Sequence, residues 1–513
     1  MVAPLISNQS DLGKLAAGTV VALSGAILGN GIAYVYGLII ARSLGPEEVG
    51  LYFLGLILMQ FFSSVCRLGL PDGLLRFVAI HAGRGDWSRV KGTFLCALFV
   101  GGSVSFLGGT LTFVFADVVS VHFFKQKDLG PYLRWFAITL PLFSIFILAT
   151  NALQALRRMD LVVLARDFIQ PLSLLVFGLG FFYLLKNSES FVAAYLVSTL
   201  IALGAAIFLL RRASASLAQS ASPRLDGWRI LLAFSLPVAG GDIAHYLSYW
   251  CDTFLLSILK SSSEVGIYQA ALRTTLLLNL LSVSLNALYA PIIADHYSSG
   301  RHQQIQLILK TLVRWCLTVA LPLVFAMSLL AEQILSLWGS EFVAGASALV
   351  ILAVSQLIFV TSGLLAFTLL MCGKQYLELG NTVFVAVLNV IVNLLLIPPY
   401  GITGAALSVL FSQIIIFCMR LLELRHVLDI NLYSPRYIKP LAALLPVSLT
   451  GTLLQVPIAR MMHTVFGSEA AVIIGISLLI AANYIIVLYM LGVEKEDVSV
   501  WKELRIHRTS LTG

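Results

Sequence analysis

One apolar segment near the middle of the chain carries a stripe of titratable and aromatic side chains. Asp242, His245, Tyr249 and Asp252 follow one another at spacings of three, four and three residues. At about 100° per residue, this spacing places all four on one face of a helix, within an arc of about 80°. Because carboxylates that face lipid are costly, we expect this face to line a cavity or to contact a partner helix.

Two interpretations of this face are open. In the first, the face binds a proton or Na⁺ and couples an ion gradient to a conformational change. In the second, it is a structural network in which Asp242 or Asp252 pairs with a cation from another part of the bundle.

Three arginines form a second candidate group. Arg67 shares a helix face with Gln60 and Ser64, Arg76 follows shortly after it, and Arg273 lies at the start of a later helix. Arginine binds phosphate oxygens in a bidentate manner, so the group predicts a site for an anionic headgroup such as a diphosphate. For Arg76, snorkelling of the side chain to the membrane surface is an alternative.

The chain that carries these residues is strongly apolar. Of its 513 residues, 59% are hydrophobic and 11% charged, and its mean hydropathy is +0.94. Soluble domains carry about 25% charged residues. The apolar runs do not alternate as in a membrane barrel, and they are long enough for helices that cross a bilayer. We therefore predict an all-α polytopic membrane protein.

About fourteen transmembrane helices are expected, the first being too long for a cleaved signal peptide. The predicted spans are Gly18–Ile40, Val49–Cys66, Gly92–Ala116, Trp135–Leu156, Phe168–Leu185, Phe191–Leu210, Leu231–Leu259, Leu276–Ala294, Trp315–Ala331, Val343–Met371, Leu379–Pro398, Gly401–Met419, Leu441–Ala459 and Ala470–Leu491. With the N-terminus in the cytoplasm, the cytoplasmic segments hold 25 of the 33 Lys and Arg residues. This bias predicts that both termini are cytoplasmic.

A short motif recurs half a chain apart. Glu48-Val49-Gly50-Leu51-Tyr52 returns as Glu264-Val265-Gly266-Ile267-Tyr268, an offset of 216 residues. An offset of six helices keeps both copies in the same orientation, which indicates a parallel repeat. We predict an N-lobe of six helices at 1–212, a linker at 213–229, a C-lobe of six helices at 230–425, and helices 13 and 14 with a cytoplasmic tail at 426–513.

The sequence carries no motif of an enzyme, a metal site or a nucleic-acid-binding domain. No HExxH, GxSxG or P-loop pattern occurs, and the six cysteines are scattered singly. The longest outer loop between clear spans, at 117–134, is too short for a catalytic domain. We therefore expect no enzymatic activity, no cofactor, no metal and no nucleic-acid partner.

Several motifs, taken in order, resemble the polysaccharide transporter or oligosaccharide flippase family. This family belongs to the multidrug/oligosaccharidyl-lipid/polysaccharide exporter superfamily. The resemblance covers residues 15 to about 425, and the last two helices only by their number. The motifs are ARSLGPEEVGLYFLG at Ala41–Gly55, LGLPDGLLRFVA at Leu68–Ala79, NALQALRRMDL at Asn151–Leu161, EVGIYQAALR at Glu264–Arg273 and GITGAALSVLFSQ at Gly401–Gln413.

The resemblance implies a two-lobed bundle in the plasma (inner) membrane that works by alternating access. It implies a polyprenyl-diphosphate-linked oligosaccharide as the substrate, moved from the cytoplasmic to the outer leaflet, together with membrane lipid and polysaccharide assembly proteins as partners. Unlike the lipid II flippases, this chain has no charge in its first span, which argues against a peptidoglycan precursor.

Two other functions compete with this one. A cation-coupled multidrug exporter of the same superfamily would use acidic cavity residues, and Asp242 and Asp252 keep that alternative open. A membrane enzyme of glycan assembly, a polymerase or a ligase, would need a sizeable outer loop, which the chain lacks.

Overall fold

A computed structural model describes residues 9–185, 187–215, 222–225, 227–279, 293, 296–466 and 469–492. Within these ranges every regular element is a helix, and ten helices are long and apolar enough to cross a membrane. The prediction of an all-α polytopic membrane protein is therefore confirmed. The number fourteen stays a prediction, because most of the eighth predicted span, Leu276–Ala294, lies outside the described residues.

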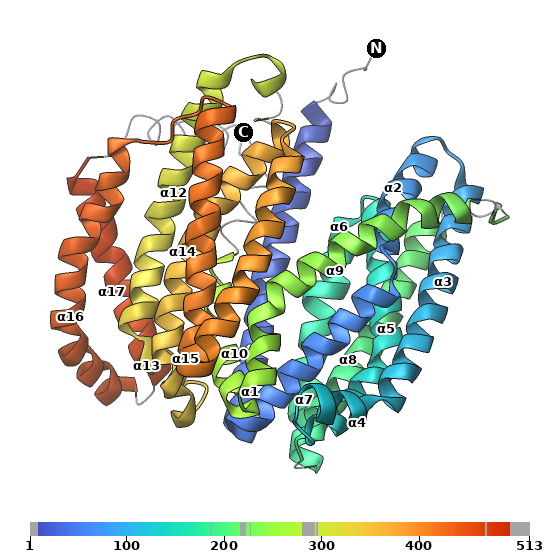
Figure 1. Ribbon diagram of the computed structural model, residues 1–513, viewed down its shortest axis with the longest axis horizontal. Coiled ribbons are helices and arrows are strands. Elements are labelled where there is room, and N and C mark those ends of the chain that lie inside the picture. Colours follow the sequence, from blue (N-terminus) through green and yellow to red (C-terminus); the bar gives the residue numbers. More distant parts are fainter. Residues whose placement is uncertain are drawn as a thin grey trace, which may run out of the picture. The chain divides into compact units, whose positions relative to one another are not determined.

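The chain divides into two compact units, which are described separately (Figure 1). The first unit comprises Met1–Arg273 and Val392–Ala405, and the second comprises Thr274–Ile391 and Ala406–Gly513. In the first unit, α9 packs with α1, α2 and α3. The predicted lobe boundaries follow a different division and stay predictions, and the predicted linker lies partly outside the described residues.

The helices of the first unit are built around α5, which packs against α1, α2, α3 and α8. Their bounds are α1 Gln9–Cys66, α2 Leu70–Gly83, α3 Trp87–Val114, α4 Ala116–Val118, η1 Val119–Phe123, α5 Leu129–Ala155, α6 Met159–Val163, η2 Leu164–Ile169, α7 Gln170–Leu185, α8 Glu189–Ala215, α9 Trp228–Leu259 and α10 Ser262–Leu276.

The second unit contains a further set of long helices. Their bounds are α12 His302–Leu329, α13 Ala331–Ser336, η3 Ser340–Gly345, α14 Ala346–Met371, α15 Gln375–Val427, η4 Pro435–Tyr437, α16 Ile438–Phe466 and α17 Glu469–Met490. The middle of α15 belongs to the first unit.

Two of the long helices are broken where the sequence predicts a boundary between spans. In α1 the break is at Gly45 (φ 80°), which precedes Pro46, and in α15 it is at Gly401 (φ 55°), which follows Pro398 and Pro399. Glycine adopts positive φ without the steric cost that other residues incur, and proline lacks the N–H that a helix needs. Local backbone chemistry therefore separates the paired spans.

The two copies of the repeated motif meet backbone to backbone within the first unit. A Cβ atom built on Gly50 would lie 1.9 Å from the carbonyl oxygen of Ser262, and one built on Gly266 would lie 1.9 Å from that of Pro46. Gly50 and Gly266 occupy equivalent positions of the repeat, and so do Pro46 and Ser262. Each glycine therefore makes with the other copy the same contact that its equivalent makes in return. No side chain larger than hydrogen fits at either glycine.

A buried ion pair joins the first and last parts of α15 in the second unit, and its arginine also reaches α14. Arg420 of α15 binds Glu378 through two of its nitrogens, one of them at 3.1 Å, and donates a hydrogen bond of 2.6 Å to the Ser362 hydroxyl of α14. Both charged side chains are nearly buried. Because each charge has its partner, this pair is complete without a ligand.

The glycine contact predicts a loss of stability in Gly50→Ala. The new methyl group would overlap the Ser262 carbonyl, and overpacking of this kind costs about 1–3 kcal/mol. We expect a lower Tm in detergent. The control is Gly31→Ala in the same helix, where a Cβ atom would meet no atom within 4 Å. Equal Tm values for the two variants would contradict this prediction.

Candidate functional site

Helix α9, which carries the predicted stripe, packs closely against α1 and the turn before α2. A Cβ atom on Gly69, whose φ is +66°, would lie 2.2 Å from the carbonyl oxygen of Ser235 in α9. Nearer the centre of α9, the Tyr246 hydroxyl donates a hydrogen bond of 2.9 Å to the carbonyl oxygen of Ile57. The close approach fixes α9 beside Arg67, which lies in that turn.

Arg67 and Asp242 lie in the same charged cluster. Asp242 is the largest electrostatic partner of Arg67, and Asp72 also acts on both residues. No direct ion pair or hydrogen bond joins Arg67 to either carboxylate among the described residues. Asp242 and the neighbouring His245 are exposed, whereas Arg67 is half-buried. Arg67 is thus a cation close to two carboxylates, Asp242 and Asp72, and forms a direct ion pair with neither.

Arg273 of α10 has a different environment. Its guanidinium carbon lies 3.7 Å from the centre of the Phe53 ring, a cation–π contact. Its main electrostatic partners are four phenols, those of Tyr52, Tyr195, Tyr246 and Tyr249. Its Nε atom is buried and has no hydrogen-bond partner. None of the carboxylates discussed above is among these partners, and among the described residues no ion pair of Arg273 is found.

Asp252 is separated from the rest of the predicted stripe by its burial. Its side chain is 4% exposed and accepts a hydrogen bond from the Tyr268 hydroxyl of α10. One residue on, Thr253 accepts a hydrogen bond of 2.9 Å from Gln269. Asp252 therefore joins α9 to α10, while Asp242 lies beside Arg67. Tyr249 is the member of the stripe that interacts with both Asp252 and Arg273.

Arg76, the third predicted headgroup arginine, is exposed on α2. Its guanidinium carbon lies 4.5 Å from the ring centre of Phe234 in α9. Arg67 and Arg273 both interact electrostatically with Tyr246, which lies between their two surroundings, whereas Arg76 lies apart beside Phe234.

Of the aromatic residues around Arg273, the sequence indicated Tyr249 but not those of α1 and α8. Phe53 and Tyr52 lie in α1 and Tyr195 lies in α8, more than 70 residues from Arg273 in each case. One signal was present, because Tyr52 closes the first copy of the repeated motif. Tyr268, which binds Asp252, closes the second copy.

The family model for polysaccharide biosynthesis proteins matches residues 15–297, more than half of the chain. The chain belongs to this family. The family model for the lipid II flippase MurJ matches residues 174–475, again more than half. Together these matches confirm the resemblance to the flippases of the multidrug/oligosaccharidyl-lipid/polysaccharide exporter superfamily.

Similar proteins come from archaea and bacteria. One is the Haloferax volcanii protein named "Probable low-salt glycan biosynthesis flippase Agl15", 23% identical over 75% of this chain and 78% of that protein. Another is "Stage V sporulation protein B" of Bacillus subtilis, 22% identical over 94% of this chain and 96% of that protein.

Solved structures show the same fold. The lipid II flippase MurJ in an inward closed conformation matches with a TM-score of 0.71 and 13% identity, over 93% of this chain and 98% of that one. An inward-facing MATE multidrug resistance transporter matches with a TM-score of 0.66 and 15% identity, over 80% of this chain and 98% of that one.

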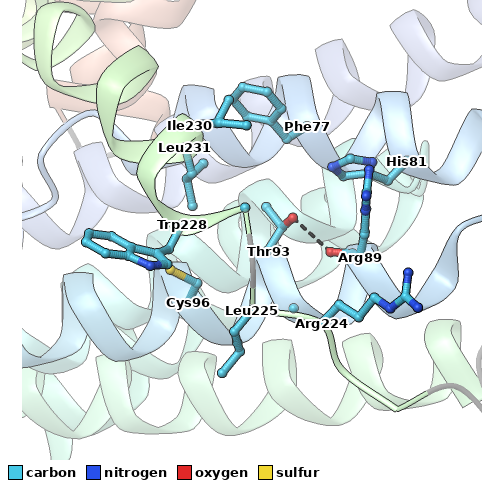
Figure 2. A pocket seen from close by; sticks show the side chains of 12 residues that line it. Phe77, His81, Arg89, Thr93, Cys96, Arg224, Leu225, Trp228, Ile230 and Leu231 are labelled. Atoms are coloured by element: carbon cyan, nitrogen blue, oxygen red, sulfur yellow. Dashed lines mark hydrogen bonds between the residues drawn. The ribbon is translucent and has the colours of Figure 1, made fainter.

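In this member of the polysaccharide biosynthesis family, a small cavity of about 150 Å³ lies in the first unit between α2, α3 and the start of α9 (Figure 2). Its lining includes His81, Arg89 and Arg224, of which Arg224 belongs to the predicted linker. The Arg224 N–H donates a 3.0 Å hydrogen bond to the Ser88 carbonyl. A Cβ atom on Gly92 would lie 1.7 Å from the Arg224 carbonyl oxygen, so this part of the linker lies directly on α3.

This contact predicts that Gly92→Ala detaches the linker from α3. The clash would raise the fraction of molecules in which the linker has left α3 by about tenfold. Trypsin cleavage after the exposed Arg224 should rise in proportion. Gly102→Ala in the same helix is the matched control, because a Cβ atom there would meet side-chain atoms at 3.7 Å, an ordinary contact. Equal cleavage rates in both variants would show that the contact does not hold the linker.

Proposed function

We propose that this protein flips a polyprenyl-diphosphate-linked oligosaccharide across the plasma membrane, for the biosynthesis of cell-surface polysaccharide. The substrate would move from the cytoplasmic to the outer leaflet by alternating access. The observation that carries the proposal is Arg273, whose guanidinium contacts the Phe53 ring, interacts electrostatically with four phenols and has a buried Nε without a hydrogen-bond partner.

An anionic headgroup would supply what Arg273 lacks. A charge taken out of water is costly unless a partner of opposite sign and hydrogen bonds replace the water. A diphosphate offers both, since guanidinium groups bind phosphate oxygens with two parallel hydrogen bonds. The surrounding phenols add donors for phosphate and flat surfaces for sugar rings.

Arg67 is proposed as a second contact for the headgroup. Asp242 and Asp72 are close enough to stabilise its charge but leave its nitrogens without a direct ion pair. A headgroup phosphate would therefore compete with carboxylates at Arg67, which favours release over tight retention. Arg76, exposed beside Phe234, would attract the headgroup at the membrane surface.

The relatives support the choice of substrate. One relative's name contains glycan biosynthesis and flippase, and the matching family model describes polysaccharide biosynthesis. The uncharged first span favours a glycan cargo over a peptidoglycan precursor. The Lys and Arg bias supports an orientation with both termini cytoplasmic, and the repeat supports two six-helix lobes that alternate about the site.

We propose that ion coupling, by H⁺ or Na⁺, resides in the Asp252 group. Asp252 links α9 to α10 through Tyr268, and α10 carries Arg273, so a change in the charge of Asp252 would act on the helix that holds the headgroup site. Tyr249 interacts with both Asp252 and Arg273. His245, beside Tyr249, and Asp242 extend this network along α9.

The alternative function is a cation-coupled multidrug exporter, because this chain shares its fold with a MATE multidrug resistance transporter. Asp242 and Asp72, both near Arg67, are the acidic residues that such an exporter would use. Transport of a cationic dye but not of a diphosphate-linked oligosaccharide by the reconstituted protein would favour this alternative.

We expect Arg273→Gln to slow flipping about tenfold or more, because hydrogen bonds to charged groups contribute about 1.5–3 kcal/mol. The measurement is the appearance of a diphosphate-linked oligosaccharide on the far leaflet of proteoliposomes. Arg273→Lys should fall between the variant and the unaltered protein, since lysine keeps the charge but not the bidentate geometry. Arg67→Gln should also slow flipping.

The matched control is Arg134→Gln, which removes an exposed arginine whose partner is Asp117. It should leave the rate unchanged. Unaltered flipping by Arg273→Gln would refute the headgroup site, whereas a similar loss in Arg134→Gln would point to a general effect of charge.

Asp252→Asn should abolish the response of flipping to an imposed pH or Na⁺ gradient while keeping a hydrogen-bond acceptor for Tyr268. Asp242→Asn, on the same helix, is the comparison for a carboxylate outside the buried link. If the gradient still accelerates flipping in Asp252→Asn as strongly as before, Asp252 has no part in coupling.

A further inference from the structure

The second unit contains an apolar cavity that the proposed flipping site does not use. It has a volume of about 540 Å³ and lies between α12, α14, the end of α15 and the segment that leads to α16. Leu317, Leu357 and Phe417 represent its lining from the three helices. Ten of its fifteen lining residues are apolar, and the others include Arg425 and Asn431. The apolar majority suits a hydrocarbon chain.

A basic cavity adjoins the apolar one. Its volume is about 250 Å³, and three cations line it, Lys310 and Arg314 of α12 and Arg436 of η4. No Asp or Glu is among its lining residues. Tyr433 lines both cavities, so an apolar cavity and a cationic cavity lie on the two sides of one residue.

A buried hydroxyl lies near both cavities. Tyr437 lines the apolar cavity, interacts electrostatically with Arg314, and its Oη has no hydrogen-bond partner. Burial raises the pKa of Tyr437 to about 12, so the hydroxyl stays protonated and can donate at neutral pH. Arg314 itself is 8% exposed, which makes it a cation held within the protein.

We propose that the two cavities together form a site that binds an anionic phospholipid of the cytoplasmic leaflet. One acyl chain would occupy the apolar cavity, and the phosphate would lie between Lys310, Arg314 and Arg436. The Tyr437 hydroxyl would donate to a headgroup oxygen. The Lys and Arg bias assigns this end of α12 to the cytoplasm, where anionic headgroups are bound by basic pockets between helices.

The proposed cargo also has a phosphate headgroup and a hydrocarbon chain, but the site favours a resident phospholipid. The basic cavity, at about 250 Å³, has room for a phosphate and little more, whereas the cargo carries several sugars next to its phosphates. The inference does not rest on the flipping function, because all of its residues lie in the second unit.

Native mass spectrometry of the full-length protein in detergent tests the proposal. The probes are phosphatidylglycerol and phosphatidylcholine with identical acyl chains, and a polyprenyl diphosphate as competitor. We expect phosphatidylglycerol to bind more tightly than phosphatidylcholine. Lys310→Gln with Arg436→Gln should weaken its binding by about fivefold for each charge removed.

Matched controls separate the site from general charge and hydrophobicity. Arg301→Gln with Lys374→Gln removes two cations of the same unit that do not line the cavity, and should change nothing. Leu357→Trp should fill the apolar cavity and weaken binding, whereas Leu370→Trp, at an exposed position of α14, should not. Tyr437→Phe removes the hydroxyl alone and should weaken binding without disturbing the fold.

Three results would overturn the proposal. The first is equal binding of the two phospholipids. The second is phosphatidylglycerol binding that the Lys310 and Arg436 changes, Leu357→Trp and Tyr437→Phe all leave intact. The third is displacement of phosphatidylglycerol by an equal concentration of polyprenyl diphosphate, which would assign the site to the cargo.

Discussion

A guanidinium group that leaves water must find its compensation inside the protein, and three arginines of this chain find it in different ways. The charge of Arg420 is compensated by direct contacts with Glu378 and Ser362. Arg67 has two carboxylates in its neighbourhood but no direct contact with either. Arg273 has aromatic rings and phenols and a nitrogen without a partner. The degree of compensation distinguishes the structural Arg420 from the arginines that we propose as anion-binding residues.

The position of these arginines depends on backbone geometry. Gly69 brings α9 against the turn that carries Arg67, and Gly50 and Gly266 bring the start of α10 against α1, which carries Phe53. In each case a side chain would occupy the space that the neighbouring backbone fills. The charged site therefore rests on contacts made by residues that have no functional group.

The sequence predicted the features that depend on local pattern. Apolar length predicted the membrane helices, and the boundaries between predicted spans fell at the two breaks, Gly45 and Gly401. The spacing of Asp242, His245, Tyr249 and Asp252 correctly indicated residues along a single helix. It could not show that Tyr268 of α10 would bury Asp252 while Asp242 stayed exposed, because that difference comes from a neighbouring helix.

Features that bring distant segments together were beyond the sequence. The aromatic surroundings of Arg273 combine residues of α1, α8 and α9, and nothing in the spacing of those residues relates them. Glu378 and Arg420 form an ion pair although they are 42 positions apart in the sequence. Each lies near the end of a predicted span, where charged residues are common, so the sequence gives no sign that they pair. The two adjoining cavities of the second unit likewise arise from packing and leave no motif.

The reciprocal contact of Gly50 and Gly266 restricts how the two halves of this chain can evolve. At these two positions each copy is constrained by the main chain of the other. A side chain at either position would clash with the main chain of the other copy, so each half can change here only at the expense of its packing against the other.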